Sequence, residues 1–181
     1  NDFTAVIPGR TLNEINTLAM MFVGTAVTIP RFLIISSVGI VNTMFAHILP
    51  LLAMPVGLFL VKQFIDDVPN ELIEAAKLDG AGDFYIYTKI ILPLIKPAIV
   101  TVSILAFQSA WNNTETAMLY VSNEELQTFA YYLGTLSGAS NAVSGAGVGA
   151  AAALILFLPN LIIFIIMQSK VIDTMAYSGM K

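Results

Sequence analysis

The chain has 181 residues, of which 57% are hydrophobic and only 11% are charged, and its mean hydropathy is +0.81. Soluble domains carry about 25% charged residues, so this composition excludes a water-soluble protein and predicts an all-α bundle of transmembrane helices. With a formal net charge of −4 and no cysteine, we expect no nucleic-acid partner, no disulfide framework and no cysteine metal site.

The N-terminal segment contains the first predicted span. The chain begins at Asn1 with neither an initiator methionine nor a signal pattern, so we expect it to be part of a longer protein with further spans upstream. The first span runs roughly over 13–29 and ends at Pro30 and Arg31. The next segment, 32–42, is apolar but contains two serines and a glycine. It is interpreted as an interfacial helix or a re-entrant turn, with one continuous helix as the alternative.

Three further segments approach the about 20 apolar residues that a transmembrane helix needs. They are 43–64, with Pro50 and Pro55 as expected kinks; 90–110, with two prolines near its entry; and 148–167, which follows a run of glycine and alanine. Prolines are tolerated in packed membrane helices, and small residues let helix backbones approach closely.

The distribution of basic residues predicts the orientation of the four spans. If the spans alternate in direction, only Arg31 lies on one side of the membrane, whereas seven basic residues lie on the other, which is therefore cytoplasmic. These seven are Arg10, Lys62, Lys77, Lys89, Lys96, Lys170 and Lys181. The loop 112–146 has no Lys or Arg, as expected of an extracytoplasmic loop.

A polar segment between the second and third spans predicts a short cytoplasmic surface helix. Asp67 can cap this helix, Pro69 suits its first turn, and Glu71 and Glu74 put negative charge where the helix dipole favours it. Gly80 predicts the end of the helix, and a second helical stretch follows three residues later.

The same segment carries a motif with fixed spacing. Positions 74–93 contain Glu-Ala-Ala, then three residues and Gly, then nine residues and Ile, and finally one residue and Leu-Pro. This spacing resembles the cytoplasmic signature of the permease subunits of binding-protein-dependent ABC importers. The residues around it, 68–76 and 92–94, resemble the carbohydrate branch of that family, close to the shorter maltose-type permease. The resemblance extends from about Phe22 to Lys181.

The resemblance implies a type I ABC importer permease, with residues 1–181 forming a single transmembrane domain that lacks its N-terminal helices. Such a subunit lies in the bacterial plasma (inner) membrane, contacts membrane lipids, and passes a sugar or oligosaccharide into the cytoplasm. It has no catalytic site and binds no cofactor or metal, because ATP and Mg are bound by a partner ATPase. The implied partners are a cytoplasmic ATPase dimer, a second, related permease subunit and an extracytoplasmic solute-binding protein.

The resemblance also assigns roles to residues. The helix 74–80 would lie in a cleft of the ATPase, with Glu74 against a basic residue and Gly80 forming the elbow. The residues assigned to ATPase coupling are Glu71, Glu74, Ala75, Ala76, Asp79, Gly80, Leu92 and Pro93. Those assigned to the binding protein or the substrate are Trp111, Asn112, Asn113 and Glu115. After Asn112 the chain departs from the aromatic and Pro-Leu pattern common in the branch, so the resemblance carries no substrate identity.

Several alternatives stay open. The solute could be an amino acid or a polyamine, and an ion-coupled secondary transporter or a membrane scaffold are the other classes. With one histidine, no cysteine and no P-loop pattern, the sequence argues against an enzyme. His47 lies in the second span, where it is either a structural hydrogen-bonding residue or part of a functional site. Trp111 either anchors the chain at the interface or stacks on a sugar ring.

Overall fold

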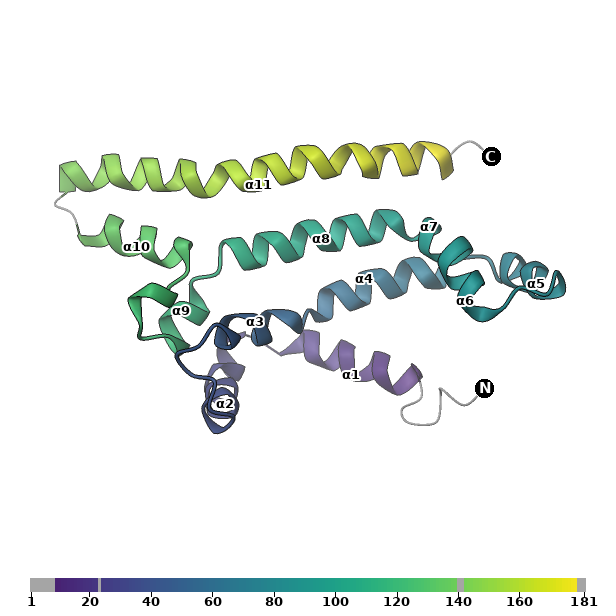
Figure 1. The fold of residues 1–181 in the computed structure, drawn as a ribbon, viewed down its shortest axis with the longest axis horizontal. Coiled ribbons are helices and arrows are strands. Elements are labelled where there is room, and N and C mark those ends of the chain that lie inside the picture. The colour runs from purple at the N-terminus through teal and green to yellow at the C-terminus, as the bar shows by residue number, and fades with distance from the viewer. Residues whose placement is uncertain (1–8, 23, 140–141, 179–181) are drawn as a thin grey trace. The chain divides into compact units, whose positions relative to one another are not determined.

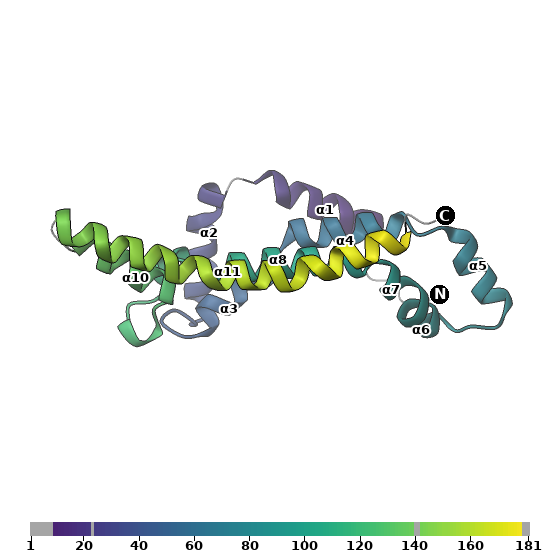
Figure 2. The ribbon, with the colours of Figure 1, turned by 90° about the horizontal axis from the view of Figure 1, so that it is seen from above.

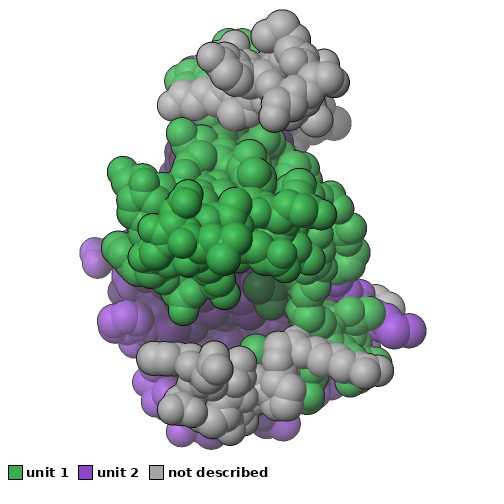
Figure 3. Space-filling model, turned by 90° about the vertical axis from the view of Figure 1, so that its right-hand side faces the viewer, with its two compact units in different colours: residues 1–19, 55–105, 165–181 green, residues 20–54, 106–164 purple. Residues whose placement is uncertain are grey.

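The computed structural model describes residues 9–22, 24–139 and 142–178, and every regular element among them is a helix. The all-α membrane fold predicted from composition is therefore confirmed. Asn1 and Lys181 lie outside the described residues. The chain divides into two compact units, coloured separately in Figure 3. Unit 1 comprises 1–19, 55–105 and 165–181, and unit 2 comprises 20–54 and 106–164.

Unit 1 contains the polar segment between the second and third spans. Figures 1 and 2 show its helices in chain order. They are α1 (Gly9–Met21), α4 (Pro55–Asp66), α5 (Asn70–Leu78), α6 (Asp83–Ile86), the π-helical turn η1 (Tyr87–Ile91), α7 (Leu92–Leu94), most of α8 (Lys96–Trp111) and the end of α11 (Ala142–Ser178).

Unit 2 contains the remaining helices. They are α2 (Gly24–Ser37), α3 (Phe45–Leu52), the last turns of α8, α9 (Glu115–Tyr120), the 3-10 turn η2 (Glu124–Leu126), α10 (Phe129–Ala139) and most of α11. Helix α9 contacts both α3 and α2, and the buried core between them consists of Ile35, Ala46, Tyr120 and Val121.

Two predicted spans are confirmed. Residues Phe45–Asp66 and Ala146–Gln168 are each long and apolar enough to cross a bilayer. The first of these contains the expected kink, because α3 ends at Leu52 and α4 begins at Pro55. Proline has no backbone N–H and suits the first turn of a helix, so a new helix starts there at little cost.

The boundaries of the first predicted span were wrong. Helix α1 ends at Met21 and α2 begins at Gly24, inside the predicted span 13–29. Helix α2 then continues past Pro30 to Ser37, so the proline expected to end the span lies inside a helix. A proline leaves one carbonyl without its helical partner, and a membrane helix absorbs this through neighbouring groups.

The predicted start of the third span, 90–110, was also wrong. The straight helix α8 begins only at Lys96, and residues Asp83–Leu94 meet it at 70°. Pro93 and Pro97 flank the break at Ile95. The π-helical turn η1 directly precedes α7, the short helix that contains Pro93. Prolines remove two backbone donors within one turn, and π-turns commonly accompany such kinks. The two helices satisfy the criterion for a span only as a bent pair.

The turn between α2 and α3 is fixed to the segment after α9 by Asn42. Its backbone N–H donates to the Tyr120 carbonyl at 2.8 Å. Its Oδ1 accepts from the backbone N–H groups of Ser122 at 3.1 Å and Asn123 at 2.8 Å. Asn42 has a φ of +61°, a left-handed conformation that asparagine and aspartate tolerate better than other side chains.

We predict that Asn42→Ala destabilises the protein by about 2–4 kcal/mol, because it loses two accepted hydrogen bonds and a side chain suited to the left-handed conformation. Asn42→Asp keeps both acceptors and that conformational tolerance, and it is the matched control. Denaturant unfolding of the full chain in detergent measures the difference. Equal stability of the Ala and Asp variants would contradict this role of Asn42.

Candidate functional site

The predicted cytoplasmic helix forms as α5, but its N-terminus differs from expectation. The residue that caps it is Pro69, and no side chain supplies a cap hydrogen bond, so the prediction that Asp67 caps the helix was wrong. Glu71 lies in the first turn and Lys77 in the last, where both charges interact favourably with the helix dipole.

The C-terminus of α5 is a Schellman turn centred on Gly80. The Ala81 N–H donates to the Ala76 carbonyl at 2.9 Å, and the Gly80 N–H donates to the Lys77 carbonyl at 3.0 Å. Gly80 has a φ of +81°, and a Cβ added there would meet nothing within 4 Å. The position therefore requires the left-handed conformation of glycine rather than the space left by its missing side chain.

Helix α5 buries none of its residues in the described structure. Glu71, Glu74 and Ala75 are exposed, Ala76 is half-buried, and Leu78 is 90% exposed. A helix of nine residues gains little stability in isolation and is normally held by packing. Its apolar side chains are thus available to another surface.

An open groove of about 570 Å³ lies at the elbow where α5 ends and α6 begins. Ala76, Asp79 and Gly80 line it, together with Tyr85 and Lys89 from α6 and η1. The structure therefore brings three of the predicted coupling residues to one concave surface. The other five do not line it: Glu71, Glu74 and Ala75 lie along α5, and Leu92 and Pro93 form α7.

A second concave site lies within unit 2, in a cavity of about 220 Å³. Its polar wall consists of Arg31 from α2, Ser109 from α8, and Asn113, Glu115 and Thr116 at the start of α9. Pro50, Leu51 and Met54 provide apolar lining. A concave, partly apolar site with a few converging polar groups is the usual form of a small-molecule site.

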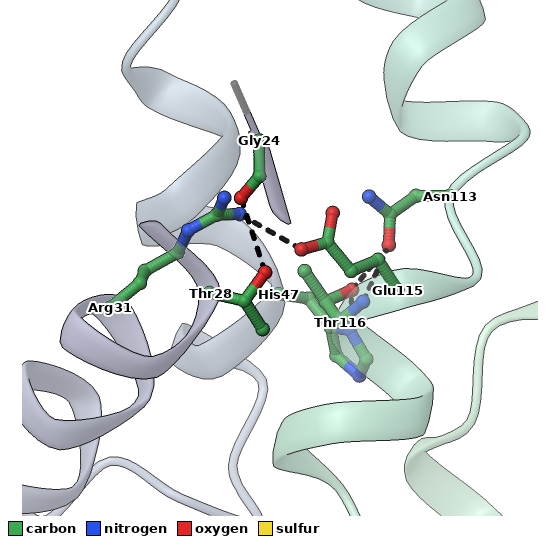
Figure 4. Close-up of polar contacts among 7 residues, drawn as sticks. All are labelled: Gly24, Thr28, Arg31, His47, Asn113, Glu115 and Thr116. Atoms are coloured by element: carbon green, nitrogen blue, oxygen red, sulfur yellow. Dashed lines mark hydrogen bonds and ion pairs between the residues drawn. The ribbon is translucent and has the colours of Figure 1, made fainter. Parts of the chain in front are cut away.

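The charges of this cavity balance. Figure 4 shows the ion pair of Arg31 and Glu115. The Nη1 and Oε1 atoms are 3.4 Å apart, and the two side chains are 29% and 47% exposed. Tyr120 is almost fully buried beside this pair. Burial raises the pKa of its hydroxyl, and the charge of Arg31 partly offsets the rise. The Tyr120 hydroxyl is therefore neutral near pH 7. Arg31 and Glu115, which line the cavity, together contribute no net charge to it.

Asn113 and Thr116 of the cavity wall are connected by hydrogen bonds. Asn113 Oδ1 accepts from the Thr116 backbone N–H at 3.0 Å and from the Thr116 hydroxyl at 2.5 Å. The Thr116 hydroxyl also contacts His47 Nδ1 at 2.8 Å, and His47 Nε2 donates to the Leu126 carbonyl at 2.8 Å. Figure 4 shows His47, Thr116 and Asn113 as one connected chain of side chains.

Two of the four residues predicted to face the binding protein or the substrate contact α11 instead of the cavity. Trp111 Nε1 donates to the Leu156 carbonyl at 3.1 Å, and its ring packs against Phe107 and Phe129. Asn112 Oδ1 accepts from Asn160 Nδ2 at 3.2 Å. Asn113 and Glu115 do line the cavity. A role in binding stays a prediction for all four residues.

Sequence reasoning missed several residues of this cavity. It treated Arg31 only as an indicator of topology, and it did not single out Ser109 or Thr116. It also left open the role of His47, which contacts Thr116 but does not line the cavity. One signal was available, because Arg31 is the sole basic residue expected on its side of the membrane.

Comparison with known proteins covers almost the whole chain. Residues 6–169 match the family described as binding-protein-dependent transport system inner membrane component. A polygalacturonan/rhamnogalacturonan transport system permease protein of Bacillus subtilis is 40% identical over 52% of this chain and 33% of its own length. A melibiose/raffinose/stachyose import permease protein of the same species is 31% identical over 84% of this chain and 56% of its own length.

A trehalose transport system permease protein of Mycobacterium tuberculosis is 28% identical over 91% of this chain and 61% of its own length. The chain thus spans between a third and three fifths of the length of these relatives. The family description and the apolar helices agree on a multi-pass protein of the inner membrane. The chain belongs to the family of inner-membrane components of binding-protein-dependent transport systems.

Proposed function

We propose that this chain is part of a permease subunit of an ATP-driven importer that moves a sugar or oligosaccharide from an extracytoplasmic binding protein into the cytoplasm. The relatives reported above are named as permeases for polygalacturonan/rhamnogalacturonan, for melibiose/raffinose/stachyose and for trehalose, which supports a carbohydrate solute. The subunit pairs with a second, related permease and has no catalytic site of its own.

The observation that carries the proposal is α5 with its elbow. The helix buries nothing of its own, ends in a Schellman turn and adjoins an open groove. A short helix exposed in this way is suited to docking against a partner, here the ATPase dimer that binds ATP and Mg. Glu74 offers a carboxylate to a basic residue of that partner, and Gly80 sets the direction in which the chain returns to the membrane.

The cavity in unit 2 is the proposed solute site of this chain. Its guanidinium, carboxylate, amide and hydroxyl groups offer both donors and acceptors, and the Arg31–Glu115 pair cancels its net charge. Such a set suits an uncharged ligand rich in hydroxyl groups, which needs many hydrogen bonds and no counterion. A polyamine would need an excess of carboxylates. An amino acid is the second candidate, because its carboxylate and ammonium groups match Arg31 and Glu115.

We predict that Glu74→Ala and Gly80→Val each lower solute-stimulated ATPase activity of the reconstituted importer about tenfold or more, while the subunit still inserts and assembles. Valine is strongly disfavoured in the left-handed conformation, at a cost of about 1–2 kcal/mol. Gly80→Asn is the matched control, since asparagine tolerates that conformation and the site has room for it. Full stimulation of the Glu74→Ala and Gly80→Val complexes would contradict coupling through α5.

We also predict that Asn113→Ala raises the KM for ATP-driven sugar uptake about tenfold, because a lost hydrogen bond to the solute amounts to about 1.4 kcal/mol. Ser103→Ala on α8 is the control, since the Ser103 hydroxyl is exposed and bonds only to the Ile99 carbonyl of its own helix. Competition by free amino acids instead of sugars would favour the second candidate. An unchanged KM for every tested solute would argue against the cavity as the solute site.

A further inference from the structure

We infer that Arg31 and Glu115 together determine which solutes the cavity of unit 2 accepts. Paired with each other, they admit an uncharged sugar and exclude a sugar of similar size that carries a single charge, whether that charge is a carboxylate or an ammonium. This inference deepens the proposed function and rests on it, because it assumes that the transported solute occupies this cavity.

The pair supplies the formal charge of the cavity wall. Among the described residues that line the cavity, only Arg31 and Glu115 are charged. The sequence of unit 2, 20–54 and 106–164, contains no other lysine or arginine. Its two other acidic residues, Glu124 and Glu125, begin the turn η2 and do not line the cavity. Removal of either member of the pair therefore leaves one uncompensated charge in the wall.

The geometry of the pair leaves both side chains accessible to a solute. Arg31 comes from α2, Glu115 is the first residue of α9, and the contact between Nη1 and Oε1 measures 3.4 Å. The side chains are 29% and 47% exposed, so the pair lies at the cavity surface and not beneath it (Figure 4). A guanidinium has five N–H donors and a carboxylate has two acceptor oxygens. Donors and acceptors beyond this one contact can therefore serve a sugar hydroxyl while the pair stays formed.

Folding stability gives little reason for such a pair. A partly exposed ion pair contributes little to stability, because water screens the charges and two side chains lose freedom. The first-turn position of Glu115 also interacts favourably with the dipole of α9, which is the structural alternative for this residue. That alternative does not require Arg31. Helix α2 belongs to a candidate bent span, and charged residues in spans are rare and commonly line solute pathways.

The pairing itself works against a solute with one charge. A sugar carboxylate can bond to Arg31 only beside Glu115 or in its place, and either arrangement leaves one carboxylate without a cation in a partly enclosed site. A sugar ammonium meets the same cost with the opposite sign at Arg31. A neutral hydroxyl accepts from the guanidinium or donates to the carboxylate without disturbing the pair. A zwitterion can pair with both groups at once, so an amino acid stays the second candidate.

Three probes built on one sugar ring test this discrimination: glucose, glucuronate and glucosamine. Their equilibrium binding to the assembled importer is measured in nanodiscs without the binding protein, so that the preference of the binding protein does not enter. The measurement is made just below neutral pH, where glucuronate is ionised and glucosamine is protonated. We expect the original protein to bind each charged sugar about tenfold or more weakly than glucose, because each brings an unpaired charge into the cavity.

Each single substitution should reverse one preference. We predict that Glu115→Gln raises the affinity for glucuronate relative to glucose about tenfold or more, because the free guanidinium then gains a charge-assisted hydrogen bond to the sugar. Arg31→Gln should do the same for glucosamine, and neither variant should favour the other charged sugar. The double variant should again disfavour both. Glu124→Gln is the matched control, since it removes one negative charge from an exposed residue outside the cavity and should leave all three affinities unchanged.

Thermal unfolding in detergent is measured in parallel, and each single variant tests the inference by itself if the other does not fold. Equal affinity of the original protein for glucose and for either charged sugar would overturn the inference. An equal loss for all three sugars in both single variants, with a lowered unfolding temperature, would also overturn it, because the pair would then act only on the fold. If Asn113→Ala weakens glucose binding while both single variants keep the original charge preference, the inference fails and the solute site stands. If glucose does not bind, or binds equally to the Asn113→Ala variant, both the solute site and the inference are overturned.

Discussion

In a bilayer, water cannot pair with a buried polar group, so the polar groups of a membrane helix must find partners within the protein. Several polar groups of unit 2 have such partners. The Trp111 indole N–H pairs with the Leu156 carbonyl, and His47 pairs on both sides of its ring. Asn42 pairs with the carbonyl of Tyr120, the last residue of α9, and with two backbone N–H groups after it. These pairs join segments of unit 2 that are far apart in the sequence.

The elements that sequence predicted well are those whose causes lie within a few residues. The end of α5 is an example, because the Schellman turn at Gly80 involves only residues 76–81 and needs a left-handed residue at a known position. The kink at Pro55 has an equally local cause. A proline alone, however, does not determine whether a helix bends. Pro30 lies inside α2, whereas Pro93 and Pro97 flank a bend of 70°. Two prolines in one turn, together with a π-turn, exceed what one helix absorbs.

The cavity could not be predicted in the same way, because its residues come together only in the folded chain. His47 contacts Leu126, 79 residues further along, and Thr116, 69 residues along. No periodicity or spacing in the sequence relates these positions. The prediction of Asn113 and Glu115 came from resemblance, and the same source also proposed Trp111 and Asn112, whose polar atoms bond to α11. The resemblance therefore selected one segment but could not distinguish the side chains that line a cavity from those that pack against a helix.

The proposed function requires that an event at α5 reaches the cavity, and one helix is suited to carry it. Helix α8 begins at Lys96, directly after the break at Ile95 that follows α7. Farther along the same helix, Ala106 and Ser109 line the cavity. A continuous α-helix is stiff along its axis because each residue is bonded to the next turn, whereas the break at Ile95 has lost backbone donors at two prolines. Under the proposed function, Ile95 is therefore the point at which this segment bends most readily, and α8 beyond it is the stiffer part.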